Sequence, residues 1–335
     1  MRRGNQGRRR RPLFPFWSPL TRAAFFFPAI VLLMFLVIIP VLGTVLLSFA
    51  SPTTGSFTGF DNYGELLADR ETADLRDAEI PFGTLLNNFI WSAVHLPMSL
   101  FTGLFLALIL QKVRGSAFVK SFIFLGMVSP GIVGGIILKF LYDERSGVVP
   151  NFFGAIGVDA LSIQWMAFPG TLLFGLIFGS VWLWAGFSMI LFSAGLTTIP
   201  KDYFEAAQID GASPWRTFWR ITWPLLRPVT IVVITMTILW ELKLFDIVFA
   251  AANVRGGVSS AADVLALQMY REAFATTSPN YNRAATIATF LTFLTLVTSV
   301  WLFRRMVLGE QHLSKGVLRE IAGPLIRRIR RSLFA

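Results

Sequence analysis

The sequence predicts an all-α integral membrane protein with six transmembrane helices and a long cytoplasmic loop between the fourth and the fifth. Its 335 residues are 54% hydrophobic and only 15% charged, whereas about a quarter of the residues in an ordinary soluble protein are charged. The mean hydropathy is +0.63, and 33 phenylalanines and 10 tryptophans suit a chain surrounded largely by lipid. The absence of cysteine excludes disulfides, thiolate metal sites and a cysteine nucleophile.

Six stretches of the chain are long and apolar enough to cross a bilayer. A spanning helix needs about 20 mostly apolar residues, because every backbone polar group must be satisfied within the segment. Asn87, Asn88 and Pro97 interrupt the second stretch. The predicted spans are 25–49, 84–110, 117–141, 171–196, 229–249 and 284–303. A basic N-terminal tail, 1–24, precedes this six-span unit of residues 25–305, and a C-terminal tail, 306–335, follows it.

The distribution of lysine and arginine predicts the orientation of these spans. With both termini in the cytoplasm, the cytoplasmic segments hold 21 of the 30 basic residues and the outer loops hold 6. This bias also accounts for the net charge of +11 without a nucleic-acid partner, since basic tails favour the anionic cytoplasmic leaflet. The apolar run behind the basic N-terminus is too long for a cleavable signal peptide, so it is expected to remain as the first span.

The C-terminal tail has the pattern of a basic amphipathic helix. Leu318, Ile321 and Leu325 recur at helical spacing and alternate with Arg319 and Arg327. A helix that lies on the membrane surface is favoured over a docking or regulatory role.

The cytoplasmic loop 197–228 reads as two short helices with a turn between them. Thr198 or Asp202 can cap the first helix, Gly211 permits the turn, and Ser213 can start the second. Its aromatic residues would be costly to leave in water, so the loop is predicted to fit a groove on a partner protein.

This loop resembles the cytoplasmic loop of the membrane subunits of binding-protein-dependent ABC importers. The signature of that family is Glu-Ala-Ala, three residues, Gly, nine residues, Ile, one residue and Leu-Pro, and the chain departs from it at Trp223, where leucine is usual. The resemblance implies that the loop couples the permease to an ATPase. The residues expected to carry that coupling are Asp202, Glu205, Ala206, Ala207, Asp210, Gly211, Ile221 and Pro224.

The resemblance covers roughly residues 25–305 and favours the sugar-transporting branch of the family. The segment Gly-Phe-Asp-Asn-Tyr at 59–63 looks like a segment that follows the first span there, and Asn88, Phe245 and Tyr270 also match. It implies a prokaryotic inner-membrane protein that is the first member of a pair of unlike permeases. The partners would be the second permease, two ATPase subunits, an extracytoplasmic solute-binding protein and a sugar or sugar derivative.

Motifs for catalysis by this chain are absent from the sequence. No Gly-x4-Gly-Lys-Ser/Thr loop is present to hold nucleotide phosphates, so the family's ATP and Mg²⁺ are expected on the partner ATPases and no cofactor on this chain. No metal site is predicted, because His95 and His312 stand alone. A packing role for His95 is favoured over a ligand or proton-relay role, although an ionisable group inside a span is by default a functional candidate.

Three charged residues lie inside the fifth predicted span. Lys243 and Asp246 are three positions apart and share a helical face, so they are predicted to form a structural ion pair. Glu241 points to another face without a local partner. It is therefore predicted to face the permease interior, toward solute or toward the second permease.

Candidate solute contacts follow from the resemblance to maltose-type relatives, in which the spans on either side of the coupling loop touch solute. Aromatic rings suit the apolar faces of sugars and carboxylates suit their hydroxyls, although an aromatic stripe in a membrane helix can equally be packing or lipid contact. Trp182 is a further candidate. Carried over by distance from the Glu-Ala-Ala motif, the positions are Ser180, Trp184, Phe187, Thr237, Trp240, Glu241 and Leu244.

A different class of function stays open at this point, a self-sufficient secondary transporter or channel. That alternative predicts inverted repeats, interrupted helices or a proton relay. The sequence shows no repeat, and a coupling loop would have no purpose in such a protein.

Overall fold

The computed structural model describes residues 19–73 and 81–305, with side chains from residue 25 onward. Within these ranges every regular element is helical, and the sole β-type pairing is an isolated bridge between Ala50 and Phe57. The predicted amphipathic tail, His312 and most of the basic N-terminus lie outside the described residues. The prediction of an all-α chain is confirmed for the described part.

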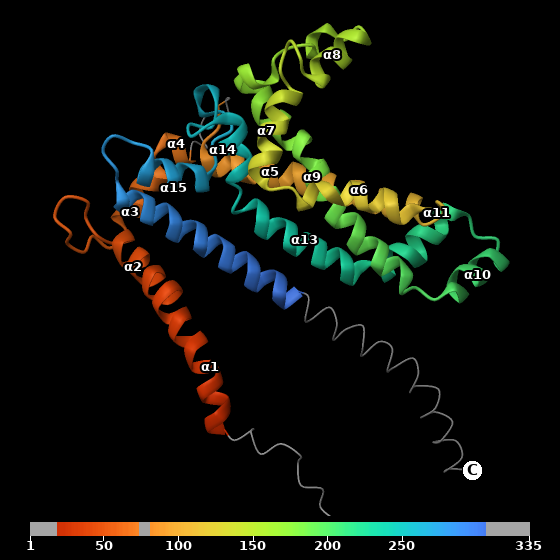
Figure 1. Cartoon of the computed structure of the whole chain (residues 1–335), viewed down its shortest axis with the longest axis horizontal. Coiled ribbons are helices and arrows are strands. Elements are labelled where there is room, and N and C mark those ends of the chain that lie inside the picture. Colours follow the sequence, from red (N-terminus) through yellow and green to blue (C-terminus); the bar gives the residue numbers. More distant parts are fainter. Residues whose placement is uncertain (1–18, 74–80, 306–335) are drawn as a thin grey trace, which may run out of the picture.

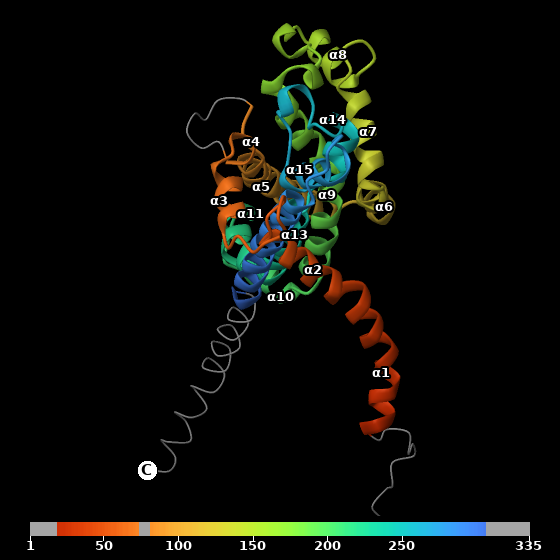
Figure 2. The same cartoon turned by 90° about the vertical axis from the view of Figure 1, so that its left-hand side faces the viewer.

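The N-terminal helix diverges from the rest of the molecule (Figures 1 and 2). It consists of α1 (Pro19–Leu33), a π-helical turn (Met34–Ile38) and α2 (Ile39–Ser48). No residue in its most apolar 18-residue window is buried, although Ser48 at its end is. A helix that is apolar all round and touches little protein is stable only where lipid or a partner covers it.

Two long helices, α5 (Thr84–Leu110) and α9 (Pro169–Thr197), form the centre of the chain. Pro97 is accommodated inside α5 without ending it. The helices approach so closely at Gly103 that an added Cβ would lie 2.3 Å from the Cβ of Ser188. Small residues that let backbones approach are typical of helix pairs in membranes.

The third predicted span is broken. Helices α6 (Ser116–Val128) and α7 (Gly131–Leu141) meet at a bend of 99°. Pro130 lacks an amide hydrogen and disfavours helical geometry at Ser129, which is extended here. The prediction of one continuous helix over 117–141 is therefore wrong.

The fifth predicted span is broken as well. Helix α13 (Arg227–Glu241) ends before residues 242–245, and α14 (Asp246–Ala252) follows. No proline or glycine lies at 242–245, so local sequence does not explain this break. Helix α14 instead packs against α7, where an added Cβ at Gly135 would lie 2.5 Å from the carbonyl oxygen of Ile247. A single helix over 229–249 is thus a second incorrect prediction, and tertiary packing is the reason.

The number of spans depends on how these bends are counted. Four helices in the described residues are long and apolar enough to cross a membrane: Phe25–Ser48, Thr84–Leu110, Pro169–Thr197 and Tyr281–Arg305. Two bent pairs raise the number to six if each is one span, namely α6 with α7 and Pro214–Leu225 with Arg227–Glu241.

Short helices surround the end of the bundle from which α8 projects (Figures 1 and 2). They are α3 (Asp61–Ala68), α4 (Arg70–Ala73), α8 (Val148–Ala155), α15 (Leu265–Phe274) and three single 3₁₀ turns, Asp159–Leu161, Trp165–Ala167 and Val258–Ser260.

Ion pairs tie these short helices to the body of the chain. Arg271 lies 2.7 Å from a carboxylate oxygen of Asp263 and also pairs with Glu71, while Arg283 pairs with Asp69. Burial raises the pKa of Asp263 to about 6, against the lowering effect of the Arg271 guanidinium. This end of the bundle therefore contains a buried carboxylate, that of Asp263, whose pKa stays above its usual range although Arg271 lies beside it.

Candidate functional site

A pocket of about 300 Å³ lies where the two broken helices cross. The breaks touch: an added Cβ at Gly131, the first residue of α7, would lie 2.9 Å from the Cβ of Asp246, the first residue of α14. Residues from the α6–α7 break, from α9 and from 240–247 line the pocket. Interrupted helices at a cavity are a known way to place backbone polar groups at a solute site in a membrane.

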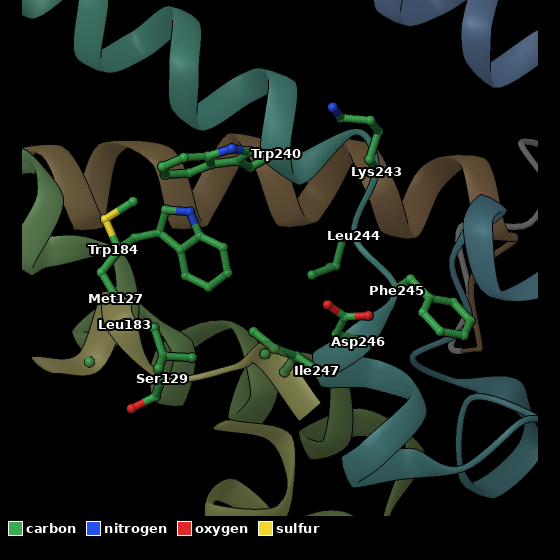
Figure 3. A pocket seen from close by; sticks show the side chains of 12 residues that line it. Met127, Ser129, Leu183, Trp184, Trp240, Lys243, Leu244, Phe245, Asp246 and Ile247 are labelled. Carbon is green, nitrogen blue, oxygen red and sulfur yellow. The ribbon is translucent and has the colours of Figure 1, made fainter. Parts of the chain in front are cut away.

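One wall of the pocket is aromatic. Figure 3 shows the indole rings of Trp184 and Trp240 on one side of the space and Phe245 with Asp246 on the other. The two indoles meet edge to face with ring centres 6.1 Å apart, and Phe187 supports Trp240 at 5.0 Å. Such a wall offers a flat apolar surface to a ring-shaped solute.

Two opposite charges also line the pocket without pairing. Lys243 and Asp246 form no ion pair with any described residue, and the Lys243 ammonium points away from Asp246 in Figure 3. The predicted structural ion pair is therefore wrong. It assumed one helix over both residues, whereas α13 ends before Lys243.

Some of the candidate solute contacts line this pocket and others do not. Trp184, Trp240 and Leu244 line it, and Phe187 lies behind Trp240. The remaining candidates, Ser180, Thr237 and Glu241, are buried in the helix packing. Trp182, the further candidate, packs against Gly126 of α6.

Four polar or adaptable residues of the pocket were not among the predicted solute contacts. These are Met127, Ser129, Lys243 and Asp246. The Ser129-Pro130 dipeptide was a usable signal, because a proline after a polar residue inside an apolar run marks a break where side chains can line a cavity.

Glu241 has a partner within the chain. Its Oε1 lies 2.7 Å from Nδ1 of His95 on α5, and both side chains are almost fully buried, at 2% and 1% exposure. Glu241 was predicted to have no local partner and to face solute or the second permease. In the folded chain it instead pairs with a residue 146 positions away in the sequence. His95 is a packed residue of the core, as the sequence analysis favoured.

The loop between α9 and α13 folds as a helix, a tight turn and a second helical segment. Helix α10 (Lys201–Ile209) is followed by a turn at Gly211, whose φ of +69° favours glycine. Ser213 then accepts a hydrogen bond from the amide of Arg216 and starts the second segment. That segment comprises α11 (Pro214–Thr217), a π-helical turn (Phe218–Thr222) and α12 (Trp223–Leu225).

The loop presents an apolar surface at the end of α9 away from α8 (Figures 1 and 2). Ile209 is 87% exposed and Trp215 is 71% exposed. Of the motif residues, Glu205 and Ala206 are exposed, whereas Ala207 is buried. Trp223, the departure from the family signature, stacks on Phe101 of α5 and so anchors the second segment to the central helix. Exposed side chains of this kind suit a docking surface.

Comparison with known protein families gives one match over most of the chain. Residues 99–308 match the sequence model of a family described as the binding-protein-dependent transport system inner membrane component. That range contains α9, both broken helices and the 197–228 loop. The resemblance noted from the loop motif is confirmed.

Individual relatives extend the match. A probable ABC transporter permease protein of Pyrococcus horikoshii is 48% identical over 88% of this chain and 99% of its own length. A permease protein of Synechocystis sp. for the uptake of osmoprotective compounds is 34% identical, and the match covers 78% of this chain and 90% of that protein. The permease protein of an alpha-glucoside transport system of Rhizobium meliloti is 29% identical, and the match covers 84% of this chain and 80% of that protein.

A solved structure has the same fold. It is a chain from a bacterial ABC transporter involved in the import of the acidic polysaccharide alginate, with a TM-score of 0.70 and 22% identity. The match covers 87% of this chain and 98% of the other.

Proposed function

We propose a transport mechanism for this chain, which belongs to the family of binding-protein-dependent transport system inner membrane components. It is a permease subunit of an ABC importer. Family membership also decides between the two classes of function left open by the sequence. The broken helices do not decide it, because a secondary transporter would have them too.

The solute of this importer is a sugar or a sugar derivative. Support comes from the alpha-glucoside permease and the alginate importer among the similar proteins, and from the chemistry of the pocket. The indoles of Trp184 and Trp240 suit the apolar faces of a sugar ring, while Lys243 and Asp246 suit its hydroxyls.

The pocket at the crossing of the two broken helices is the solute site of this subunit. The observation that carries the proposal is the contact between the α6–α7 break and the α13–α14 break at Gly131 and Asp246. A rigid-body movement of either half-helix would open or close the space between them, as alternating access requires. The pathway is completed by a second permease, and an extracytoplasmic binding protein delivers the solute.

A thiol-labelling experiment tests this site. Because the chain has no cysteine, Ser129→Cys places a single thiol of this chain in the pocket. In the assembled importer, maltose or trehalose delivered by its binding protein is expected to slow labelling of this thiol by a charged thiol reagent. Ser121→Cys, on the exposed side of α6 and outside the pocket, is the matched control. Equal labelling rates of the Ser129→Cys variant with and without either α-glucoside would contradict the proposed site.

The 197–228 loop transmits ATP hydrolysis in the partner ATPases to the spans. ATP and Mg²⁺ bind to those subunits, both termini of this chain are cytoplasmic, and the exposed surface around Ile209 and Trp215 docks on the ATPase. The turn at Gly211 sets the angle between the two helical segments of the loop.

Gly211→Val tests this coupling role. A valine at a φ of +69° is strained, so the turn is expected to change shape and transport is expected to fall while the complex still inserts and hydrolyses ATP. Gly115→Val is the control. Gly115 lies in the loop between α5 and α6, which is also predicted to be cytoplasmic, and it has a φ of +75° with open space around its Cβ position. Normal transport by the Gly211 variant would overturn the proposed role of the turn.

A further inference from the structure

A buried pair of ionisable side chains lies behind the aromatic wall of the pocket. His95 on α5 and Glu241, the last residue of α13, are hydrogen-bonded through Nδ1 and Oε1 at 2.7 Å. Neither residue lines the pocket. A pair at this depth is expensive to desolvate, and removing one partner leaves the other buried and unpaired.

The pair touches the wall through the His95 ring. The imidazole meets Trp184 edge to face at an angle of 89°, with ring centres 5.4 Å apart. Trp184 in turn meets Trp240, which directly precedes Glu241 in the chain. Three side-chain contacts and the peptide bond between residues 240 and 241 therefore link four residues of α5, α9 and α13: Glu241, His95, Trp184 and Trp240.

A second contact holds the end of α13 in the same place. The side-chain amide of Asn88, two turns before His95 on α5, donates to the backbone carbonyl oxygen of Glu241 at 3.4 Å. The Asn88 carbonyl oxygen accepts a hydrogen bond from the amide of Leu265, the first residue of α15. The helix thus ends where α5 fixes both its last side chain and its last carbonyl group.

We infer that His95 and Glu241 are positioning residues that hold the two pocket tryptophans and the α13 break in a geometry that can retain solute. This inference rests on the proposed function of the pocket. The pair acts through the indoles and does not itself touch solute in this conformation. Together with the packing of α14 on α7, it accounts for the position of the break at 242–245 directly after Glu241.

The physical reason is rotational freedom of the indoles. A tryptophan beside a cavity is packed on one side only, so its ring orientation depends on the residues that support it on that packed side. His95 supplies that support, and its bond to Glu241 fixes the imidazole plane. Loss of the bond would let Trp184 turn and would let the end of α13 move relative to α5.

The experiment compares His95→Ala and Glu241→Ala with Glu241→Gln in the reconstituted importer. The glutamine variant keeps an oxygen that can accept from His95 and is expected to restore function. The primary measurement is the amount of maltose or trehalose transported per ATP hydrolysed. The loss of this buried hydrogen bond predicts a decrease of up to about tenfold in this ratio for the alanine variants.

A spectroscopic measurement tests positioning directly, without solute. Biosynthetic 5-fluorotryptophan gives a fluorine NMR signal for each indole, and those of Trp184 and Trp240 are identified by substituting each residue with phenylalanine. Both signals are expected to shift in the alanine variants and to return in Glu241→Gln. Ser99→Ala is the control, because Ser99 is equally buried one turn further along α5 but bonds only to the Leu96 carbonyl of its own helix.

A double variant keeps the test decisive if the single alanine variants fail to assemble. His95→Phe with Glu241→Leu replaces the pair by apolar side chains, which is often neutral for stability, yet it removes the hydrogen bond. Shifted signals and a lowered transport ratio in this variant support the inference. Unchanged signals, or transport and ATP hydrolysis that fall in equal proportion, overturn it. If sugar does not protect the thiol of the Ser129→Cys variant while the fluorine signals still shift, the proposed solute site fails and the positioning role remains.

Discussion

The N-terminal helix and α9 are both apolar, but the more apolar of the two is the less buried. The most apolar 18-residue window of Phe25–Ser48 has a mean hydropathy of 3.1 and none of its residues is buried, whereas the corresponding window of α9 has a mean hydropathy of 1.8 and 67% of its residues are buried. In a soluble protein the more apolar helix would be the more buried one. Hydropathy therefore does not report burial among the helices of this chain, which follows instead from small and polar residues that pack.

The residues of the two helices illustrate the same difference. The N-terminal helix exposes large side chains such as Phe25 and Phe35. Buried positions of α9 include Gly179, Ser180 and Gly186. An added Cβ at Gly186 would lie 2.8 Å from the carbonyl oxygen of Ile123 on α6, so the packing of α9 depends on positions that have no room for a side chain.

The largest effect is expected from filling one of these close approaches. Gly103→Leu would force α5 and α9 apart, because even a Cβ there would lie 2.3 Å from the Cβ of Ser188 and 2.7 Å from the amide nitrogen of Met189. Overpacking of this severity is expected to cost about 3 kcal/mol or more and to abolish the monodisperse complex on size exclusion. Gly43→Leu in the N-terminal helix is the control, since nothing lies within 4 Å of its Cβ position. Equal behaviour of the two variants would refute the comparison.

A charge introduced into the N-terminal helix tests whether lipid covers its exposed side chains. Leu36, 70% exposed, lies near the middle of Phe25–Ser48. Leu36→Arg is expected to cost about 3 kcal/mol of insertion free energy, because an arginine at the centre of a span is poorly tolerated. Insertion can be measured by labelling a Thr53→Cys marker in the loop after this helix with a membrane-impermeant thiol reagent. Leu36→Phe should leave the labelling unchanged, and full labelling of the arginine variant would show that a partner, not lipid, covers this face.

Burial in protein also sets the protonation of Asp263, which packs beside α5. Its pKa is raised from 3.8 to about 6, so the ionised form is less favourable in the folded chain than in the unfolded one. The folded state therefore loses stability as the pH rises from about 4 to about 6, and the penalty above that range corresponds to about 3 kcal/mol. The midpoint of thermal unfolding should fall across this range.

Asp263→Asn removes this titration, so its unfolding midpoint should vary less with pH over the same range. The two curves are compared in the same detergent and at the same ionic strength. If they are parallel, Asp263 does not carry the pH dependence.

The smallest effect is expected at one of the polar contacts of the N-terminal helix. The side-chain amide of Asn282 donates to the carbonyl oxygens of Leu47 and Ala50 at 3.2 and 3.0 Å. Asn282→Ala is expected to lower the free energy of local opening at the end of α2 by about 1 kcal/mol, since these carbonyl groups lose a partner. Amide hydrogen exchange after α2 measures this change. Thr292→Ala, on an exposed face of the same C-terminal helix, should leave exchange there unaltered.

The protein family and the all-α fold class could be predicted from local patterns in the sequence. The Glu-Ala-Ala motif with Gly211 at its fixed distance indicated the family that the comparison confirms. The break at Ser129 was also accessible in principle, because Pro130 directly follows it. The assignments of individual residues to coupling and to solute binding remain predictions for the experiments above.

The break after Glu241 and the hydrogen bond between Glu241 and His95 could not be predicted from local sequence patterns. Nothing in the sequence of 242–245 ends a helix, and the pairing joins residues 146 positions apart. The expected pairing of Lys243 with Asp246 failed for the same reason, since it assumed that α13 continues. Helical spacing predicts which side chains share a face only where the helix is known to be unbroken.

Composition, helical periodicity and one spaced motif were enough to show that this chain is helical, is apolar enough for a membrane and belongs to an importer family. Those signals are local and additive along the chain, so they can be read without the fold. The folded chain alone reveals that two of the apolar stretches break, that their breaks cross at a pocket, and that Glu241 is paired behind its wall. These features depend on close packing between distant helices, and the free energy of such packing is shared among residues that no local pattern brings together.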